Sequence, residues 1–420
     1  MFTPATIAII ILVLAVISFL MEKIPVNLTI MLSMFALVLT RLVTPKEAIA
    51  GFASTTILML IGVVIVGSAL FETGVCDKIA HTVTKYAKTE RQLIMAILLL
   101  SSILSSAVSN SGTVAVFIPI IMGICARTGF SHSKLLMCAF LGSMCGGRLT
   151  LVGDAAINVL IGNQILELGY PFGFFEIGKI GLPLTIIMMV YMYRFLPDIK
   201  MKGFDDALFS SHKEIKQVSK FKQNASIIIM LLVFIGMIFE KQTGIPSYMV
   251  AIIGAVADVC CGIFTEKQAY QLVSIQTVIL LGGMVPLATA LKKTGAAQQI
   301  ANLLITLIGG STNVYFITVV IFLLTMVMTQ FMSNVVTVTL LMPIVIAVAR
   351  SIGVIPSALV MVLGIASTMS ILTPIACPPA NLIYSYGGYK FSDYLKSNIG
   401  LALVFMVTCI VVIPMIWPFY

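Results

Sequence analysis

The sequence predicts an all-α polytopic membrane protein built from two inverted-topology repeats. The chain has 420 residues, of which 60% are hydrophobic and only 10% are charged, and its mean hydropathy is +1.11. Soluble domains carry about 25% charged residues, so this composition excludes a soluble enzyme with a single anchor. Two further observations predict the repeats: motifs that recur at a nearly constant offset, and an odd number of predicted crossings in each half.

The recurring motifs lie 221 to 224 residues apart and run through most of each half. An offset that drifts by so little over a whole half indicates a duplicated unit. We therefore assign residues 1–197 to repeat 1, residues 198–223 to a polar linker and residues 224–420 to repeat 2. The matched pairs are Ile24-Pro25 with Ile245-Pro246, Val43-Thr44 with Phe264-Thr265, Ala69–Gly74 with Ala290–Gly295, and Asn158 with Asn381.

Repeat 1 begins with an apolar run that resembles a signal peptide in length. It lacks a basic leader and a small-residue cleavage site, so we interpret it as the first membrane span. The elements that we expect in repeat 1 are spans at 5–22, 24–42 and 55–73, a surface helix at 75–92, a re-entrant hairpin at 93–128, a broken helix at 135–163 and a last span at 177–196. Those of repeat 2 are spans at 225–239, 246–264 and 276–291, a hairpin at 314–350, a broken helix at 356–383 and a last span at 399–418.

The hairpins and broken helices follow from short apolar arms and from breaker residues. Each arm of 93–128 is short for a full crossing, which needs about 20 residues. A re-entrant hairpin is therefore the better interpretation, and two short spans are the alternative. The arms meet at Ser109-Asn110, and those of 314–350 meet at Ser333-Asn334. Gly146-Gly147 and Gly153-Asp154 interrupt the segment 135–163. We expect the equivalent interruption of 356–383 at 373–377.

Charge asymmetry predicts the orientation of the two repeats. Five crossings and one hairpin per repeat place the second repeat upside down relative to the first. With the N-terminus outside, 17 Lys and Arg residues lie inside and 7 outside, and Arg148, in the membrane, is the last of the 25. The positive-inside rule supports this orientation. We therefore expect a multi-pass protein of the cell (inner) membrane with both termini outside, a cytoplasmic linker at 198–223, and no nucleic-acid partner despite the net charge of +9.

The two Ser-Asn tips are the strongest candidates for a binding site. Side-chain oxygens in hydrocarbon are costly unless they meet partners. Hard cations bind several oxygen ligands, and helix ends at mid-membrane can hold an anion through their N–H groups. The broken helices should face the tips from the other side. The candidate substrate-binding residues are Ser109, Asn110, Ser111, Thr113, Ser333, Asn334, Thr337, Asp154, Cys377 and Pro378.

The tips, the broken helices and three further segments resemble the divalent anion:sodium symporter family of the ion transporter superfamily. The likeness covers nearly the whole chain, and the further segments are Gly51–Ser54, Ala69–Gly74 and Gly387–Lys396. The resemblance implies an elevator-type importer, usually a homodimer, with scaffold and transport domains. It implies sodium-coupled uptake of a small di- or tricarboxylate or of an oxyanion such as sulfate.

The same resemblance implies two sodium sites, with the anion between the tips. Carried over by position, the first site uses Ser105, Ser109, Asn110 and the backbone of Gly153. The second uses Thr329, Ser333, Asn334 and the backbone of Ala376. No cofactor is expected besides Na⁺ as the coupling ion, because the eight Cys and three His residues show no metal-ligand spacing.

Asp154 and Arg148 depart from the family pattern. Asp154 and Cys377 stand where the family often has Thr, and a carboxylate beside a dianion should repel it. One interpretation is an ion pair between Arg148 and Asp154. Alternatively, Arg148 helps to hold the anion, or Asp154 couples protons. The last interpretation gives a proton-coupled carrier or a cation/proton antiporter of the same superfamily, with Asp154 as the coupling acid.

Other function classes have less support in the sequence. We expect no enzyme, because the predicted spans contain no His, no Ser/Lys or paired-Asp arrangement and no nucleotide loop. A further alternative is a transmembrane subunit that depends on a separate binding protein. The remaining intramembrane acid, Asp258, has Leu37 at its repeat position, so we give it a packing or helix-pairing role.

Overall fold

The computed structural model describes residues 3–21, 23–75, 78, 89–128, 130–195, 219–307 and 312–420. Within these ranges every regular element is a helix. Residues 198–218 of the predicted linker and most of the predicted surface helix at 75–92 lie outside the described residues.

The helices of the first half correspond in order to the segments predicted there. The hairpin segment 93–128 contains α6 and α7, and the segment 135–163 contains α8 and α9 with residues 147–154 between them. The bounds are α1 (Pro4–Met21), α2 (Val26–Leu39), α3 (Pro45–Ala50), η1 (Gly51–Ala53), α4 (Thr55–Glu72), α6 (Glu90–Ala107), α7 (Asn110–Thr128), α8 (His132–Gly146), α9 (Ala155–Glu167) and α10 (Gly178–Phe195).

The second half contains an equivalent series of helices. Its hairpin segment contains α17 and α18, and α19 and α20 lie on either side of residues 368–377. The bounds are α11 (Lys220–Ile238), α12 (Glu240–Thr243), α13 (Ser247–Cys260), α14 (Glu266–Leu272), α15 (Ile275–Lys293), α16 (Ala296–Leu307), α17 (Val314–Met328), α18 (Asn334–Ser351), α19 (Pro356–Ser367), α20 (Pro378–Gly387) and α21 (Phe391–Ile416).

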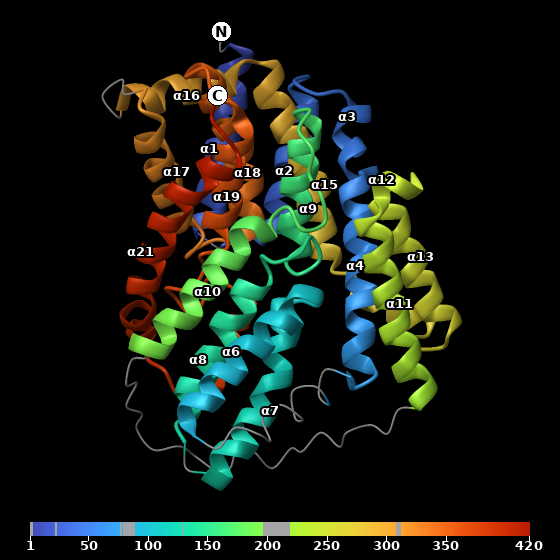
Figure 1. The fold of residues 1–420 in the computed structure, drawn as a ribbon. Coiled ribbons are helices and arrows are strands. Elements are labelled where there is room, and N and C mark those ends of the chain that lie inside the picture. Colours follow the sequence, from blue (N-terminus) through green and yellow to red (C-terminus); the bar gives the residue numbers. More distant parts are fainter. Residues whose placement is uncertain are drawn as a thin grey trace.

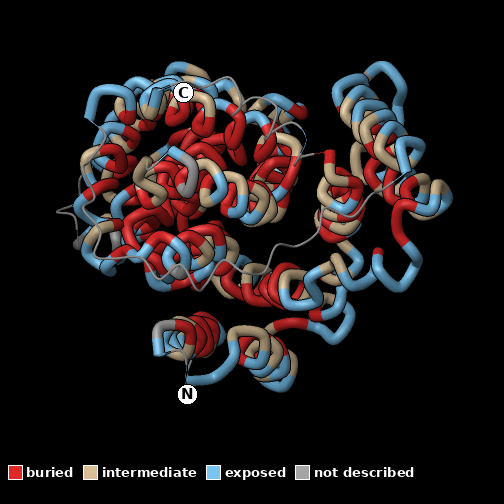
Figure 2. The backbone as a smooth tube through the Cα atoms, turned by 90° about the horizontal axis from the view of Figure 1, so that it is seen from below, coloured by how far each residue is buried: buried red, intermediate tan, exposed pale blue. Residues whose placement is uncertain are grey.

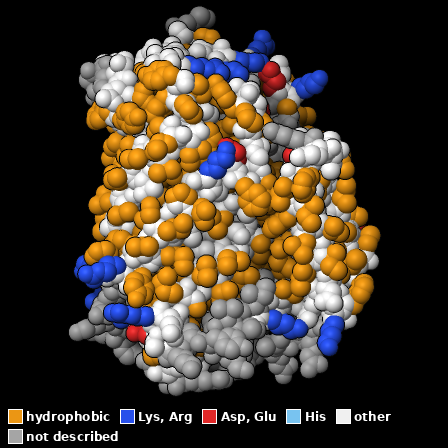
Figure 3. Space-filling model, in the orientation of Figure 1, with side chains coloured by type: hydrophobic (Ala, Val, Ile, Leu, Met, Phe, Trp, Pro, Cys, Tyr) orange, Lys and Arg blue, Asp and Glu red, His pale blue; other side chains and the backbone are white. Residues whose placement is uncertain are grey.

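The surface of the protein suits a lipid bilayer. In the part of the chain that the structure describes, six helices are long and apolar enough to cross a membrane. Apolar side chains cover most of the face in Figure 3, and most of its Lys and Arg residues lie near its two ends, apart from one charged group in its upper half. This is the distribution that a multi-pass protein needs, with charges in water and hydrocarbon contacts between them. The six helices are Pro45–Glu72, Glu90–Ala107, Lys220–Ile238, Ile275–Lys293, Asn334–Ser351 and Phe391–Ile416.

The helices form a round body with two flanking groups (Figure 2). One group contains α1, beside the N-terminus, together with α2, which packs on it. The other contains α4, α11 and α13, which pack on one another and stand apart at the right of Figure 1. The two chain termini lie at the same end of the molecule (Figure 1).

Helices α8 and α19 form the centre of the round body. Every residue of α19 from Ser357 to Ser367 is buried, and α8 is buried along nearly its whole length. A helix that is apolar on all sides must be enclosed by other helices. Gly146 allows this enclosure, because a Cβ there would lie 2.2 Å from the carbonyl oxygen of Ser102 on α6. Both helices end at the breaks, so the breaks lie at the core of the molecule.

Candidate functional site

The first tip is held by the side chain of Asn110. Helix α6 ends at Ala107, Val108 is extended (φ −141°), and α7 begins at Asn110. The Oγ of Ser105 donates to Oδ1 of Asn110 at 2.6 Å. The Nδ2 of Asn110 donates to Oδ2 of Asp154 at 3.3 Å. Asn110 therefore links the tip of the hairpin to the end of the first break.

The second tip repeats the hydroxyl–amide hydrogen bond. The Oγ1 of Thr329 lies 2.8 Å from Oδ1 of Asn334 and 2.6 Å from the carbonyl oxygen of Ser367. Ser333 caps α18, because its Oγ accepts from the backbone N–H of Val336 at 3.2 Å. The tip is thereby joined to the C-terminal end of α19, and no carboxylate takes part in these bonds.

Each break is also tied to its own hairpin by a threonine. The Oγ1 of Thr150 donates to the carbonyl oxygen of Ser106, and that of Thr373 donates to the carbonyl oxygen of Gln330 at 3.1 Å. Thr150 and Thr373 were not among the predicted site residues. Their spacing of 223 residues matches that of Asn158 and Asn381, so the repeat offset could have found them.

Gln330 is another residue that the sequence prediction missed. It is 5% exposed, and its Nε2 donates to the carbonyl oxygen of Met369 at 2.8 Å. Its Oε1 accepts from the backbone N–H of Leu372 at 3.0 Å. A buried amide with both ends bonded fixes the loop between α19 and α20. The equivalent residue in the first half is Ser106, which cannot make such a bridge.

Arg148 and Asp154 do not form the direct ion pair that the sequence suggested. Both residues are described, and the structure contains no salt bridge between them. The Nε of Arg148 donates to Oγ1 of Thr368 at 2.7 Å, and its Nη2 donates to the carbonyl oxygen of Thr368. The carboxylate of Asp154 accepts from Asn110 instead. The two charges are close enough to attract each other, but the guanidinium points to the second break and the carboxylate to the first tip.

Glycines allow the first tip and the first break to approach closely. A Cβ on Gly147 would lie 2.5 Å from Oδ1 of Asn110, and one on Gly153 would lie 2.7 Å from the carbonyl oxygen of Ser105. Asn158 supports this loop, because its Nδ2 donates to the carbonyl oxygen of Gly147 at 2.7 Å. The backbone of Gly153 thus lies next to the residues with which the resemblance grouped it.

The predicted residues differ in how accessible they are. Ser109, Ser333 and Pro378 are exposed, and Asn110, Ser111, Asp154 and Asn334 are half-buried. Thr113, Thr337 and Cys377 are buried. The Oγ1 of Thr337 donates to the carbonyl oxygen of Ser333 at 3.2 Å, and Sγ of Cys377 donates to that of Ser370 at 3.3 Å. Thr337 and Cys377 thus serve the local backbone, whereas the hydroxyl of buried Thr113 has no hydrogen-bond partner among the described residues. The exposed and half-buried side chains can meet a ligand.

Four helices begin at the tips and breaks. They are α7, α9, α18 and α20, and α7 packs on α20 while α18 packs on α9. The Asn110–Asp154 hydrogen bond joins the start of α7 to the residue before α9. The first N–H groups of a helix have no partner within it, and the helix dipole is positive there. The arrangement can therefore stabilise an anion.

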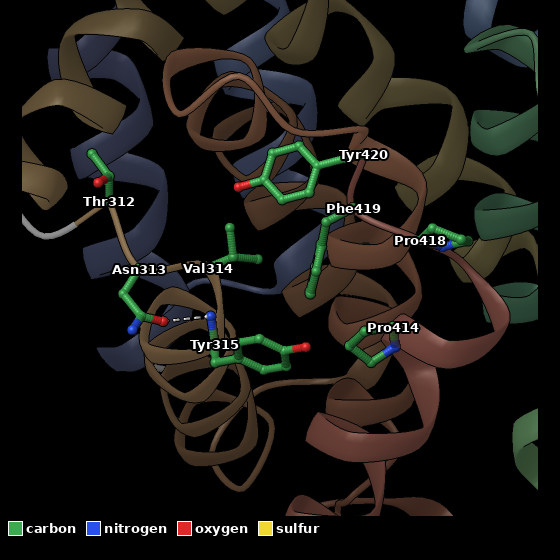
Figure 4. Close-up of a pocket in the computed structure, with 8 residues that line it drawn as sticks. All are labelled: Thr312, Asn313, Val314, Tyr315, Pro414, Pro418, Phe419 and Tyr420. Atoms are coloured by element: carbon green, nitrogen blue, oxygen red, sulfur yellow. Dashed lines mark hydrogen bonds between the residues drawn. The ribbon is translucent and has the colours of Figure 1, made fainter.

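A separate pocket lies near the C-terminus (Figure 4). Its volume is about 390 Å³, and none of the predicted site residues lines it. Tyr315 and Phe419 meet edge to face in it, with ring centroids 5.9 Å apart. Within the described ranges, the structure contains no group of three His, Cys, Asp or Glu residues that could hold a metal ion. The lining residues are Thr312, Asn313, Val314, Tyr315, Pro414, Pro418, Phe419 and Tyr420.

The family model described as "Citrate transporter" matches residues 16–240 and 234–420, nearly the whole chain. The chain belongs to the citrate transporter family. Membership agrees with the resemblance to ion transporters that the tips suggested, and it makes the protein a membrane-spanning transporter.

Named relatives of this family member are also transporters. An uncharacterized transporter of Haemophilus influenzae is 26% identical, over 93% of this chain and 87% of its own. The sodium-dependent dicarboxylate transporter SdcS of Staphylococcus aureus is 22% identical, over 94% of this chain and 83% of its own. The uncharacterized transporter YfbS of Escherichia coli is 28% identical over 64% of this chain, and the match spans 47% of YfbS, about half of that relative.

Two solved structures share the fold of this citrate transporter family member. MtrF of Neisseria gonorrhoeae superposes with a TM-score of 0.64 at 13% identity, over 99% of this chain and 95% of its own. The YdaH transporter of Alcanivorax borkumensis superposes with a TM-score of 0.61 at 12% identity, over 88% of this chain and 87% of its own. At such identities the likeness concerns the fold alone.

Proposed function

We propose that this family member is a secondary active transporter that couples sodium to the uptake of a small di- or tricarboxylate or of an oxyanion such as sulfate. The observation that carries the proposal is the pair of tips. Each tip presents a hydroxyl bonded to an Asn amide oxygen, at 2.6 Å in the first and 2.8 Å in the second. Such clusters of neutral oxygens suit Na⁺, and the helix starts beside them suit an anion.

The candidate sodium ligands are the two sets carried over from the resemblance. The first contains Ser105, Ser109, Asn110 and Gly153, and the second contains Thr329, Ser333, Asn334 and Ala376. The sodium-dependent relative SdcS supports this choice of ion. The transported anion would lie between the tips, near the half-buried and exposed side chains of Ser109, Asn110, Ser333 and Asn334.

The proposed movement is of the elevator type, within an inverted-repeat dimer. The helices that carry both tips and both breaks pack on one another and would form the transport domain. The flanking helices would form the scaffold and the contact with a second copy. Phe71 of α4 lies against the first tip, because a Cβ on Gly112 would be 2.5 Å from its ring. This apolar contact is one that a moving tip could slide along.

A second candidate function is proton coupling through Asp154. It is favoured because the Asp154 carboxylate accepts a hydrogen bond from Asn110 and forms no salt bridge with Arg148. An acid at the tip could take up a proton where a sodium ion would otherwise bind. This candidate includes a proton-coupled carrier and a cation/proton antiporter of the same superfamily.

Uptake into proteoliposomes tests both candidates. Labelled citrate, succinate and sulfate would be offered under an inward Na⁺ gradient or under a pH gradient alone. We expect accumulation of one of these anions only with Na⁺. Accumulation driven by the pH gradient without Na⁺ would show that the coupling ion is a proton and not sodium. No accumulation under either gradient would reject the anion-transport proposal.

The proposed topology has its own test. We propose that both termini lie outside and the 198–223 linker lies in the cytoplasm. A single Cys introduced at Lys213, on a Cys-free background, should resist an impermeant thiol reagent in intact cells and react after permeabilisation. Labelling in intact cells would overturn the inverted orientation.

A further inference from the structure

Three long polar side chains hold the loop between α19 and α20. Gln330 and Asn398 each donate to a backbone carbonyl oxygen of this loop at 2.8 Å. Arg148 donates to both the hydroxyl and the carbonyl oxygen of Thr368, the first residue of the loop. Gln330 and Asn398 belong to the same half of the chain as the loop, whereas Arg148 belongs to the first break. Arg148 therefore joins one break to the other.

The contact between Arg148 and Thr368 fixes a direction as well as a distance. The Nε of Arg148 donates to Oγ1 of Thr368 at 2.7 Å, and Nη2 donates to the carbonyl oxygen of the same residue. The hydroxyl of Thr368 donates in turn to the carbonyl oxygen of Ile365 at 2.8 Å, which orients its lone pairs. A planar guanidinium with two bonds to one residue allows little rotation. The two breaks are thus held in one relative orientation.

Arg148 is itself held at both of its ends. A Cβ on Gly181 of α10 would overlap the carbonyl oxygen of Arg148, so the two backbones are in direct contact. The guanidinium lies over Phe405 of α21, with Cζ 5.8 Å from the ring centre. Arg148 is 1% exposed, and close-packed interiors transmit displacements. A movement of one break would therefore move the other through this side chain.

The relative position of the two breaks sets the width of the proposed anion site. In the first half α7 and α9 begin at the tip and the break, and in the second half α18 and α20 do so. Helix α7 packs on α20, and α18 packs on α9, so each helix start of one half is paired with one of the other half. A shift between the halves would change the separation of the N–H groups that can bind an anion.

We propose that Arg148 is a positioning residue whose two hydrogen bonds to Thr368 fix the separation of these helix starts and so select the size of the transported anion. The inference rests on the proposed function and names the residue that determines substrate size. Arg148 does not touch the anion, because its guanidinium is buried and directed at the second break. Its charge also acts on Asp154, and the experiment separates that effect from positioning.

Uptake by Arg148→Lys tests the inference, because Lys keeps the positive charge but donates from a single atom. Labelled succinate, citrate and sulfate would each be offered to proteoliposomes under an inward Na⁺ gradient. The anion that the wild type accumulates would then be competed with the other two, unlabelled. In Arg148→Lys we expect the KM of that anion to rise about tenfold, with Vmax within about twofold of the wild type. The order in which the other two compete should change as well.

Two further variants separate positioning from a general loss of packing. Thr368→Val removes the hydroxyl acceptor and should raise the KM about threefold, whereas adding it to Arg148→Lys should raise the KM no further. Asn398→Leu removes a bond to the same loop from within its own half. It should lower thermal stability and leave the KM within about twofold of the wild type.

Three results would overturn the inference while leaving the proposed function intact. They are a wild-type KM and competition order in Arg148→Lys, which would mean that the charge alone matters, a KM rise in Asn398→Leu equal to that in Arg148→Lys, and an additive effect of Thr368→Val. If Arg148→Lys does not reach the membrane, Thr368→Val decides alone, and an unchanged KM overturns the inference. No accumulation of any of the three anions by the wild type would reject the proposed function itself, and the inference with it.

Discussion

The first and second tips share their hydroxyl–amide bond, their serine cap and the threonine that ties each break to its hairpin, but they differ in the charges and the packing around them. In each, a hydroxyl five residues before the Asn holds the amide oxygen. The first tip is then tied to an acid and packed against glycines, whereas the second is tied to α19 and locked by Gln330. The shared bond depends only on the path of the backbone through the tip. The comparison therefore teaches that the two halves of the chain can keep the same backbone path while their charges diverge.

The largest expected effect comes from removing the shared bond. Asn110→Ala and Asn334→Ala should each lower uptake by more than about 100-fold, because each removes an oxygen ligand and the support of a tip. Uptake per unit of protein in the membrane would be measured in proteoliposomes. Asn302→Ala, at an exposed position of α16, is the matched control and should transport normally. Normal uptake by either tip variant would show that its tip is not part of the site.

A smaller effect should come from the two charges that distinguish the tips. Arg148→Met should lower the free energy of unfolding by about 2 kcal/mol, because Thr368 loses its donors, and Asp154→Asn by about 1 kcal/mol. Since each side chain is bonded to a partner of its own, the double variant should be less stable than either single variant. Denaturant titration of all three would measure this. Recovery of stability in the double variant would instead support the ion-pair interpretation.

A smaller effect again should come from the glycine of the first break. Gly153→Ala should cost about 1.5 kcal/mol, because the new Cβ would lie 2.7 Å from the carbonyl oxygen of Ser105. At the equivalent position the second half already has Ala376, so Ala376→Gly should cost only about 0.5 kcal/mol, for chain entropy. Both values come from the same unfolding assay. Equal costs at the two positions would mean that the breaks are equally packed.

The smallest effect should come from removing the charge of Glu47, which belongs to one of the two capping boxes that start α3 and α14. Thr44 pairs with Glu47 in one, and Thr265 pairs with Gln268 in the other. Glu47 also has an exposed salt bridge to Lys293. Glu47→Gln should leave thermal stability unchanged within error. Gln can take the place of Glu in a capping box, as Gln268 does at the start of α14, and an exposed salt bridge contributes little to stability. Thr44→Ala, which removes the cap itself, should lower stability by about 1 kcal/mol.

The sequence by itself determined the helical class, the membrane setting and the places where the helices are interrupted. These follow from apolar length and from breakers such as Gly146, Gly147 and Gly153, which act locally. The offset near 223 residues also located both Ser-Asn tips. Local physics is enough for these features because they depend on neighbours along the chain.

Only the tertiary structure decided which polar groups meet. Arg148 and Asp154 are six residues apart in sequence, yet Arg148 bonds Thr368, 220 residues away, and Asp154 bonds Asn110, 44 residues away. Gln330 carried no signal in the sequence, although it joins the second tip to the loop after α19. Partners of this kind are set by how α8 packs on α6 and α7, and how α19 packs on α17 and α18, in a closed core. Spacing along the chain does not encode that contact, because each buried group bonds whichever partner the packing brings within reach.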